Sequence, residues 1–505
     1  MPTLTRLPFS THSDYYRMNA FDVGSRWLMR KTKIVATIGP ASKDPAILEQ
    51  MLIAGMDVAR LNFSHGTFDE HTEAIKNIRE LAARHNKHVA ILQDLGGTKM
   101  RLGAVDGTFR LNVGDVITLS SDASSQRKDV LPFPQPRIIQ TLRPGNKVFI
   151  SDGTICLEVT ESLNTSVKTI VKNGGLISSF KGVNLPGVAI ERPIISEADM
   201  LAIKHGVKNQ VDWLAVSFVR SAKDLRDVRE YMESVGGAIP IMAKLERTEA
   251  IDNLNSIMNE AQAVMVARGD LGIEIPMYKV PVVQKKIVEL ANKSARLSVI
   301  ATQMLRSMII SPTPTRAEIS DITTAVLDGC DAILLSDETA IGQFPVEAIK
   351  VAAETIAEAE TIYPYYKDMT AADRTQAIAE AATDLCEALR AIPIVLTSTG
   401  RAAFEVSRYR PQNDVLVFSH DEAILRRVCI GWGLIPVAAI APEQDIPKLV
   451  RTLIKKSLES GLVKEMDTVT IVHGFLTGVT GTTNTIQVLD LRQYLNSEHG
   501  LSQGA

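Results

Sequence analysis

Short apolar runs alternate with longer amphipathic stretches along most of this chain. Helical patterns such as Asp69–His85, Ser221–Ser234 and Val280–Ser294 separate most of the runs. The runs are rich in Val, Ile and Leu and nearly continuous, as expected of strands buried on both faces. They are Lys33–Ile38, Asp57–Leu61, His88–Gln93, Asp212–Ser217, Ile239–Lys244, Ala263–Arg268, Ser298–Gln303 and Asp331–Ser336. Eight strand–helix units in sequence predict an α/β fold, a (β/α)8 TIM barrel, and disfavour a doubly wound open sheet.

The interval between Asp94 and Asp212 is too long for a single crossover helix. It contains short runs at Val116–Ser120, Lys147–Ser151 and Thr154–Val159, separated by many prolines and glycines. Such turn-rich short strands are typical of an all-β unit. We therefore expect a small β-barrel lid domain at 97–183, inserted after the third strand over the mouth of the barrel. The barrel itself would comprise 31–96 and 184–350.

A new alternation begins near residue 350 and predicts a separate C-terminal α/β domain at 351–505. Helical Ala371–Ala391 leads into apolar runs, which are Ile394–Thr397, Val415–Phe418, Thr468–Val472 and Thr485–Leu489. At the other end, residues 1–30 have no sustained periodicity. Their four arginines suggest a transit peptide, but Asp14 and Asp22 argue against one, so we expect a disordered or loosely docked extension.

Composition excludes several classes of function. Apolar residues make up 45% of the chain and charged residues 22%, the balance of a globular protein. The formal net charge of −3 gives no reason to expect a nucleic-acid or membrane partner. The four cysteines are scattered and never at CxxC spacing, which favours a reducing, cytoplasmic location without zinc or disulfides. No apolar run approaches the roughly 18 residues of a membrane span.

Polar residues stand at the carboxyl ends of the predicted strands, where barrel enzymes carry their catalytic groups. The second strand carries Arg60 near its end and is followed by three more of them, and the third to seventh strands end in others. In chain order these residues are Arg60, Asn62, Ser64, His65, Asp94, Ser217, Lys244, Glu246, Asp270 and Thr302, and Gly269 stands directly before Asp270.

Lys244, Glu246 and Asp270 together predict a phosphoryl-transfer centre. Lys244 and Glu246 point the same way, because strand side chains repeat every two residues. Asp270 can then meet Glu246, and two carboxylates with only oxygen ligands suit Mg²⁺. Lys244 would stabilise a moving phosphoryl group, and Gly269 would let an anion approach the backbone. A rim salt bridge and an ordinary turn are the alternatives. The chain has no GxxxxGK[ST] loop, no GxGxxG after a strand and no HExxH motif.

Six motifs in colinear order resemble the pyruvate kinase family. They are Lys31–Ser42 (KTKIVATIGPAS), Gly55–Gly66 (GMDVARLNFSHG), Lys181–Gly187 (KGVNLPG), Ala267–Glu274 (ARGDLGIE), Ala301–Leu305 (ATQML) and Pro314–Glu318 (PTRAE). The resemblance extends from about Lys31 to Leu489. It implies a glycolytic enzyme that transfers phosphate from phosphoenolpyruvate to ADP, giving pyruvate and ATP. It also implies the barrel, the inserted lid and an effector-type C-terminal domain.

The resemblance assigns roles to individual positions. Lys244 matches the phosphoryl-transfer lysine, and Glu246 and Asp270 match ligands of Mg²⁺ or Mn²⁺. Catalytic and substrate-binding positions are Arg60, Ser217, Lys244, Gly269, Asp270 and Thr302. Nucleotide positions are Asn62, His65, Arg101 and Lys181. Thr302 lies near the proton that the enolate must gain, but the sequence leaves open whether Thr302 or a relayed water donates it.

Several residues depart from the family pattern. Asp337 replaces a turn glycine in Leu335–Thr339 (LSDET), where an Asp tolerates a left-handed conformation. Thr98 replaces a proline, so the nucleotide-side loop is expected to be more flexible. The family K⁺ positions correspond to Asn62, Ser64, Asp94 and Leu95, the last of which lacks the usual hydroxyl. Lys99 stands where many relatives have an acid, so we expect that K⁺ is not required. The alternative is that Lys99 points to solvent and the cation still binds.

The C-terminal domain carries two hydroxyl- and glycine-rich turns, at Leu396–Arg401 and Gly478–Asn484. Their backbone N–H groups could cradle a phosphate, although a pair of tight turns would look the same. We expect a phosphorylated effector to bind there, at Thr397, Ser398, Thr399, Gly400, Arg401, Gly481 and Thr482. The resemblance also implies a homotetramer.

Two other functions compete with the kinase. A catalytically silent regulatory protein could keep the fold, but Lys244, Glu246, Asp270 and Thr302 argue against it. A different barrel enzyme that handles phosphoenolpyruvate or a 2-oxo acid, such as an aldolase or a mutase, would have no need for a nucleotide lid with Lys181. Pyruvate formation and its dependence on ADP separate these functions.

Overall fold

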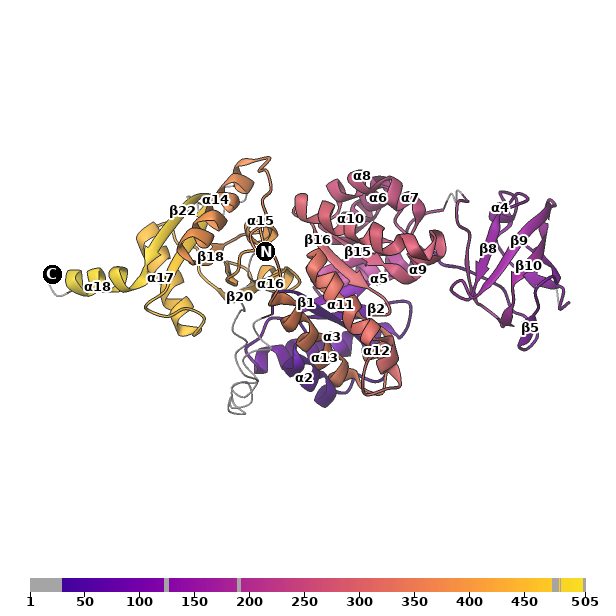
Figure 1. Cartoon of the computed structure of the whole chain (residues 1–505), viewed down its shortest axis with the longest axis horizontal. Coiled ribbons are helices and arrows are strands. Elements are labelled where there is room, and N and C mark those ends of the chain that lie inside the picture. The colour runs from indigo at the N-terminus through magenta and orange to yellow at the C-terminus, as the bar shows by residue number, and fades with distance from the viewer. Residues whose placement is uncertain (1–29, 122–126, 189–191, 475–480, 482, 503–505) are drawn as a thin grey trace, which may run out of the picture.

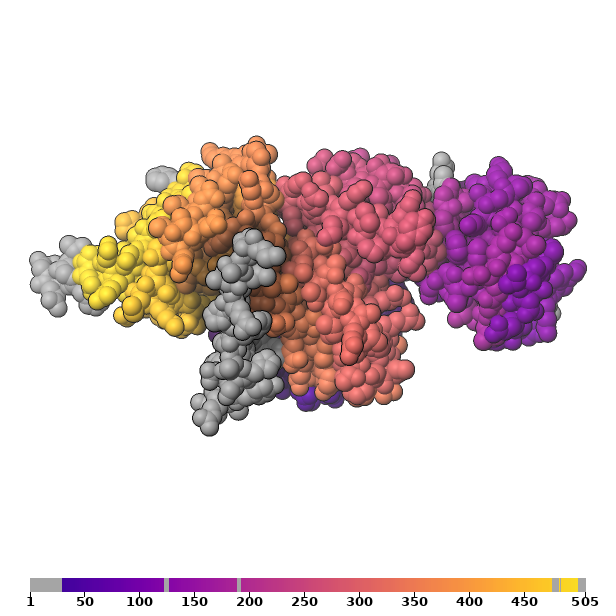
Figure 2. Space-filling model, in the orientation of Figure 1, coloured from indigo at the N-terminus to yellow at the C-terminus, as the bar shows by residue number. Residues whose placement is uncertain are grey.

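Three bodies lie in a row along the long axis of the molecule (Figure 1). The computed structural model describes residues 30–121, 127–188, 192–474, 481 and 483–502. The expected N-terminal extension, apart from Arg30, therefore lies outside the described residues. The barrel is central, with the C-terminal domain at one end. Figure 2 shows the inserted lid as a lobe of its own at the other end.

The central body is a closed barrel of eight parallel strands, in the order β1-β17-β16-β15-β14-β13-β3-β2. The predicted (β/α)8 barrel is thus confirmed, and each expected run overlaps one strand, with ends that differ by at most two residues. The strands are β1 (Lys33–Ile38), β2 (Val58–Asn62), β3 (Ala90–Asp94), β13 (Trp213–Val216), β14 (Ile241–Leu245), β15 (Ala263–Ala267), β16 (Leu297–Ala301) and β17 (Ala332–Leu335).

Alternating side chains of each strand serve two cores, which explains why the runs are continuously apolar. In β1, Ile34 and Ala36 pack outward in the cluster that includes Leu48 of a covering helix. Val35 points inward and packs with Val58 and Trp213 inside the barrel. A polar residue in the middle of such a strand would be buried on either face, so polar residues collect at the strand ends.

Helices cover the outside of the barrel, and several begin at capping boxes formed by Thr67, Ser196 and Thr315. Asp337 does not adopt the left-handed turn that we considered; it opens the short helix α12. The helices are α2 (Pro45–Ala54), α3 (Phe68–Arg84), α5 (Glu197–Lys208), α6 (Ala222–Ser234), α7 (Thr248–Asp252), α8 (Leu254–Glu260), α9 (Arg268–Glu274), η3 (Met277–Lys279), α10 (Val280–Lys293), η4 (Arg306–Ile309), α11 (Arg316–Asp328), α12 (Asp337–Ala340) and α13 (Pro345–Glu360).

The inserted lid is almost entirely β-structure with its own apolar core, which includes Leu119, Phe133 and Leu157. Seven strands form a sheet in the order β4-β12-β8-β9-β10-β6-β7, and β11 pairs with β5. Their bounds are β4 (Met100–Arg101), β5 (Phe109–Leu111), β6 (Val116–Ser120), β7 (Val130–Pro132), β8 (Lys147–Ile150), β9 (Ile155–Ser162), β10 (Ser166–Asn173), β11 (Gly175–Ile177) and β12 (Gly182–Asn184), with the helix α4 (Pro136–Ile139). The entering strand β4 and the leaving strand β12 pair antiparallel, so the hinge is a two-stranded connection.

The C-terminal domain has a five-stranded sheet in the order β20-β19-β18-β21-β22, and only the edge strand β22 is antiparallel. Its strands are β18 (Ile392–Leu396), β19 (Val415–Ser419), β20 (Leu434–Ala439), β21 (Thr468–Gly474) and β22 (Thr483–Asp490). Its helices are α14 (Arg374–Leu389), α15 (Arg401–Arg408), α16 (Glu422–Val428), α17 (Ile446–Glu459) and α18 (Leu491–Ser502).

A buried arginine joins this domain to the barrel. The Arg410 guanidinium, 1% exposed, donates to Asp331 Oδ1 at 3.0 Å, Asn292 Oδ1 at 2.6 Å and the Gly329 carbonyl at 2.8 Å. Asp331 precedes β17, so the C-terminal domain meets the amino-terminal face of the barrel, opposite the mouth. Among the described residues, none of the helices combines the length and the apolar composition that crossing a membrane needs.

Candidate active site

The polar strand ends predicted from the sequence meet at the mouth of the barrel. Lys244 is the fourth residue of β14, and its ammonium lies 2.7 Å from Ser217 Oγ, 3.0 Å from Glu246 Oε1 and 3.3 Å from Asp94 Oδ1. Burial would lower the pKa of Lys244, but the charges of Asp94 and Glu246 outweigh it and raise that pKa above its ordinary value. The buried ammonium therefore stays charged and held on three sides.

Arg60 and Asp94 form a second ion pair at the mouth. Arg60 Nε donates to Asp94 Oδ2 at 2.7 Å, and its Nη1 donates to Thr37 Oγ1 at 2.8 Å. Burial acts to raise the pKa of Asp94, yet Lys244 and Arg60 together lower it. Asp94 is thus an ionised carboxylate that holds one cation at each of its two oxygens.

Glu246 and Asp270 are close enough for each charge to affect the other. Glu246 is 1% exposed, and its Oε2 accepts the backbone N–H of Phe218 at 2.9 Å. Burial first, and then the charge of Asp270, raises the pKa of Glu246 against the opposing effect of Lys244. Within the described ranges, no group of three or more His, Cys, Asp or Glu could hold a metal ion. A metal held by these two carboxylates would need further oxygen ligands, which water and substrate can supply.

Residues that follow the sixth and seventh barrel strands, β15 and β16, are in contact with each other. The Gly269 N–H donates to Thr302 Oγ1 at 2.8 Å, so the substrate positions Gly269 and Thr302 are brought together. Thr302 has φ 74° and Gln303 φ 58°, both in the left-handed region that β-branched and bulky residues avoid. Arg268 supports this strained turn, because its Nη2 donates to the Thr302 carbonyl at 2.8 Å and its Nη1 pairs with Asp321. Strain of this kind concentrates at functional sites.

The loop after β2 carries Asn62, Ser64 and His65. Asn62 Oδ1 accepts the Ser64 N–H at 3.1 Å, and the His65 carbonyl contacts His71 Nε2 at 2.9 Å. Asn62 pairs with Asp94 across the sheet, which brings these two K⁺ positions together. Leu95 follows directly, but it is buried in the apolar core and offers no side-chain oxygen.

The two lid-side nucleotide positions are exposed at the hinge. Arg101 lies in β4 and donates to the Phe180 carbonyl at 3.1 Å, while Lys181 precedes β12. Arg101 pairs with Gly182 in register, so Arg101 and Lys181 lie on neighbouring strands. Among the described contacts, neither side chain makes an ion pair with Asp94 or Glu246, the two carboxylates beside Lys244.

Lys99 does not point freely to solvent. Its ammonium lies 3.2 Å from Asp152 Oδ1 in the lid and 4.0 Å from Asp270 Oδ1 on the barrel. Its ion pairs among the described residues are with these two carboxylates and not with Asp94. The positive charge of Lys99 therefore lies beside a predicted Mg²⁺ ligand.

The C-terminal turns are linked through the start of α14. Thr397 Oγ1 accepts the Gly400 N–H at 3.0 Å, and Arg401 pairs with Asp373. The next residue, Arg374, donates to the Gly481 carbonyl at 3.0 Å. Thr397–Arg401 and Gly481 thus border one region, whereas Thr482 lies outside the described residues. Ser398 and Thr399 belong to the same turn as Thr397.

Sequence reasoning missed two contributors to the mouth. Phe218, whose backbone holds Glu246, has φ 59°, and nothing in its residue type predicts a left-handed conformation. Arg268 ends a predicted strand, but its residue type alone assigns it no role. Its position could have suggested a supporting role, because Arg268 directly precedes the two predicted site residues Gly269 and Asp270.

Comparisons with known proteins agree with this geometry. The family model described as "Pyruvate kinase, barrel domain" matches residues 29–349, and "Pyruvate kinase, alpha/beta domain" matches 376–489. Pyruvate kinase 2 of Synechocystis is 37% identical over 489 residues, covering 95% of this chain and 82% of the relative. Pyruvate kinase of Staphylococcus aureus (strain MRSA252) is 37% identical over 490 residues, covering 94% and 83%.

A solved structure extends the likeness to the fold. The crystal structure of a pyruvate kinase from Cryptosporidium parvum superposes with a TM-score of 0.86 at 31% identity, covering 92% of this chain and 97% of the other. The family resemblance in the six sequence motifs is therefore confirmed. The chain belongs to the pyruvate kinase family of phosphotransferases, glycolytic enzymes that transfer phosphate from phosphoenolpyruvate to ADP and yield pyruvate and ATP.

Proposed function

We propose that Lys244 is the residue that carries phosphoryl transfer between phosphoenolpyruvate and ADP in this chain. The observation that supports it is the position of its ammonium, held by Ser217, Glu246 and Asp94 at the carboxyl ends of the strands. A fixed positive charge in a partly desolvated mouth stabilises the charge on the moving phosphoryl oxygens, which is the main catalytic need of such a transfer.

Glu246 and Asp270 hold a divalent cation, Mg²⁺ or Mn²⁺. Their chemistry fits: burial and mutual repulsion raise the pKa of Glu246, and a cation between the two carboxylates would offset both effects. When bound, the metal would neutralise phosphate charge and polarise substrate oxygens. The backbone N–H of Phe218 orients Glu246 for this role.

The predicted substrate-binding residues form two sets around Lys244. Arg60, fixed by Asp94 and Thr37, binds phosphate oxygens, and Ser217 positions the Lys244 ammonium. Gly269 and Thr302 lie together and face the enolate end of the substrate, with Thr302 near the site of protonation. Asn62 and His65 after β2, and Arg101 and Lys181 at the lid hinge, bind the nucleotide; closing of the lid would bring the two pairs together.

This enzyme does not require K⁺. Both carboxylate oxygens of Asp94 already face cations, since Oδ2 accepts from Arg60 and Oδ1 lies 3.3 Å from Lys244. Leu95 supplies no ligand, and Asn62 Oδ1 accepts the Ser64 N–H. Lys99 adds a compact positive charge at the mouth and repels a monovalent cation by Coulomb force. It supplies the charge that K⁺ supplies in relatives.

A phosphorylated effector binds between Thr397–Arg401 and Gly481. The links from Arg401 to Asp373 and from Arg374 to Gly481 support a common site. The chain forms a homotetramer, supported by adjacent exposed apolar side chains on the barrel: Met277 is 73% exposed, Tyr278 78% and Val282 56%. An effector with different affinity for two states of such an oligomer would tune activity.

Two further assignments stay predictions. The domain boundaries are 1–30, 31–96 with 184–350, 97–183 and 351–505, supported by the separate apolar cores of the lid and barrel. A cytoplasmic location is supported by the four buried cysteines, Cys156, Cys330, Cys386 and Cys429, all of which are free thiols.

A coupled assay of pyruvate formation tests the function. The purified full chain is given phosphoenolpyruvate and Mg²⁺, with and without ADP. We expect pyruvate only when ADP is present, with ATP formed in equal amount. A silent regulatory protein would give no pyruvate in either case. An aldolase or mutase would consume phosphoenolpyruvate without ADP.

A further inference from the structure

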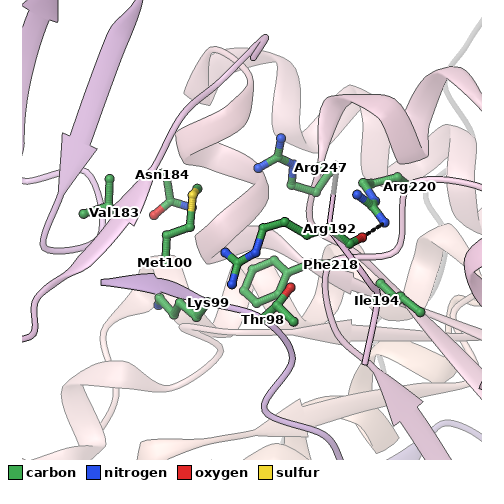
Figure 3. A pocket seen from close by; sticks show the side chains of 10 residues that line it. All are labelled: Thr98, Lys99, Met100, Val183, Asn184, Arg192, Ile194, Phe218, Arg220 and Arg247. Atoms are coloured by element: carbon green, nitrogen blue, oxygen red, sulfur yellow. Dashed lines mark hydrogen bonds between the residues drawn. The ribbon is translucent and has the colours of Figure 1, made fainter. Parts of the chain in front are cut away.

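A small cavity lies at the hinge between the lid and the barrel, and Lys99, assigned above, is among the residues that line it (Figure 3). Its volume is about 40 Å³, and residues from the lid strands and from the barrel both line it. The lining residues that matter are Asn184 at the end of β12, Phe218 after β13, and three arginines, Arg192, Arg220 and Arg247. None of the predicted substrate, nucleotide or metal residues lines it.

Two of the three arginines are compensated by carboxylates. Arg220 pairs with Asp224 at 2.8 Å. Arg247, 6% exposed, pairs with Glu249 at 3.0 Å and lies 3.4 Å from Glu274. These ion pairs hold the two guanidinium groups in the cavity wall, and they leave little net charge there.

Arg192 is different, because its Nη1 is buried and has no hydrogen-bond partner among the described residues. Figure 3 shows its guanidinium pointing into the middle of the lining side chains, between Phe218 and Met100. Burial, and then the nearby charge of Arg220, lowers the pKa of Arg192. An arginine cannot escape this situation by losing its proton, since its pKa stays far above neutral pH. A buried donor of this kind is costly unless an acceptor reaches it.

Asn184 supplies a second unsatisfied group in the same cavity. It is 5% exposed, and its Oδ1 is buried without a hydrogen-bond partner in the part of the chain that the structure describes. One wall of the cavity therefore presents a cationic donor and another presents a neutral acceptor. A ligand that satisfies both needs an oxyanion oxygen and an O–H group on the same small centre.

We propose that this cavity binds a hydrogen phosphate group, free or at the end of a small ester, between Arg192 and Asn184. A phosphate oxygen accepts from Arg192 Nη1, and the P–O–H donates to Asn184 Oδ1. The size of the cavity agrees with this ligand. About 10–15 Å³ of cavity volume holds one water molecule, so the cavity has room for roughly three waters, which is close to the size of a phosphate. Charge-assisted hydrogen bonds to a planar guanidinium are among the stronger ones in proteins.

Such a ligand would act on the hinge. Asn184 belongs to the lid strand that leaves toward the barrel, whereas Arg192 lies in the returning segment and its carbonyl accepts from Arg220 of the barrel at 2.9 Å. The cavity also borders Phe218, whose backbone N–H holds Glu246. Phosphate bound there would tie the lid to the barrel beside the metal site.

The test measures phosphate binding with the substrate site filled. The full chain is kept with Mg²⁺ and saturating phosphoenolpyruvate but no ADP, and sodium phosphate is titrated at constant ionic strength by calorimetry and thermal melting. We expect saturable stabilisation of the wild type. Arg192→Gln should weaken binding about tenfold or more, and Asn184→Asp should weaken it by charge repulsion. Arg137→Gln, an exposed lid arginine, is the matched control and should bind phosphate as the wild type does.

Three further arms complete the design. Sulfate, which has no O–H at neutral pH, should bind more weakly than phosphate. Tighter binding of glycerol phosphate than of phosphate would indicate the end of an ester as the ligand, and weaker binding would indicate the free ion. In either case, loss of that binding in Arg192→Gln supports the site. Arg192→Lys, which keeps the charge, should retain part of the affinity. The absence of any phosphate effect on the wild type would mean that the cavity holds only water and would overturn the proposal, as would equal binding by Arg192→Gln.

Discussion

Lys99 of the lid hinge lies 4.0 Å from a carboxylate oxygen of Asp270, a predicted metal ligand on the barrel. These two opposite charges attract each other, with an interaction of about 4 kcal/mol for unit charges at this distance and an effective dielectric constant of 20. Lys99 also reaches Asp152, so it joins lid and barrel.

The first prediction is that turnover does not depend on K⁺. Activity is measured with a bulky quaternary ammonium as the only monovalent cation, and KCl is then added at constant ionic strength. We expect little change, because Lys99 already supplies the charge. Lys99→Glu should lower activity without K⁺ and regain part of it when KCl is added. Activation of the wild type by about tenfold or more would refute K⁺ independence.

The second prediction concerns the metal. Glu246→Ala and Asp270→Ala should each raise the Mg²⁺ concentration needed for half-maximal activity steeply, because a single carboxylate holds a hard cation poorly. Glu249→Ala, which removes a carboxylate that pairs with Arg247 instead, is the control. If the Mg²⁺ titration of either site variant matches the wild type, the two residues do not share a metal.

The third prediction is a pH dependence of stability caused by Glu274. Burial raises the pKa of Glu274 to about 7, although Arg247 lies 3.4 Å away. Burial dominates because Arg247 is shared with the nearer Glu249, while the Glu274 side chain is 0% exposed. The folded chain thus binds this proton more tightly than the unfolded chain does. The resulting stabilisation is complete below pH 4.5 and is lost as the pH rises to about 7.

Thermal melts between pH 5 and 8 check this effect in wild type and Glu274→Gln. The wild type should lose stability relative to the variant as the pH rises, by on the order of 1–3 kcal/mol, since one pKa unit corresponds to about 1.4 kcal/mol. Glu249→Gln removes a charge that raises the pKa of Glu274 and frees Arg247 to pair with it, so this variant should show a smaller loss. Parallel curves for wild type and Glu274→Gln would show that Glu274 is ionised throughout.

The fourth prediction concerns the C-terminal turns. A screen of sugar phosphates and nucleotides should find a compound that raises the melting temperature and shifts the saturation curve for phosphoenolpyruvate. Arg401→Gln should abolish this response, because it removes the cation that lies beside Gly400 and Asp373. The idea of an effector site fails if no compound changes either property of the wild type.

Much of the fold could be predicted because the barrel strands are buried on two faces and therefore read as continuous apolar runs. β20 (Leu434–Ala439) escaped prediction: after Leu434 its residues are only half-buried, and Pro436 interrupts the strand pattern. The short lid strands β4 and β12 were also missed, since two or three residues carry no periodicity.

The candidate site could be predicted only where a residue's type reveals its chemistry. Lys244, Glu246 and Asp270 stand out because charged side chains at the ends of buried apolar strands indicate a functional site. Phe218 does not stand out, since its contribution is a backbone N–H in a left-handed turn. Arg192 and Asn184 meet only through the return of the chain from the lid, and no local pattern encodes that contact.

The most direct measurement compares pyruvate formation by wild type and Lys244→Met. Loss of the ammonium removes the charge that stabilises the moving phosphoryl group, so we expect kcat to fall on the order of 10²-fold or more. Lys204→Met, an exposed lysine on α5, is the matched control and should keep wild-type turnover. Circular dichroism and melting temperature establish that the variant is folded. A folded Lys244→Met enzyme with near wild-type kcat would contradict the assignment of Lys244 as the phosphoryl-transfer residue.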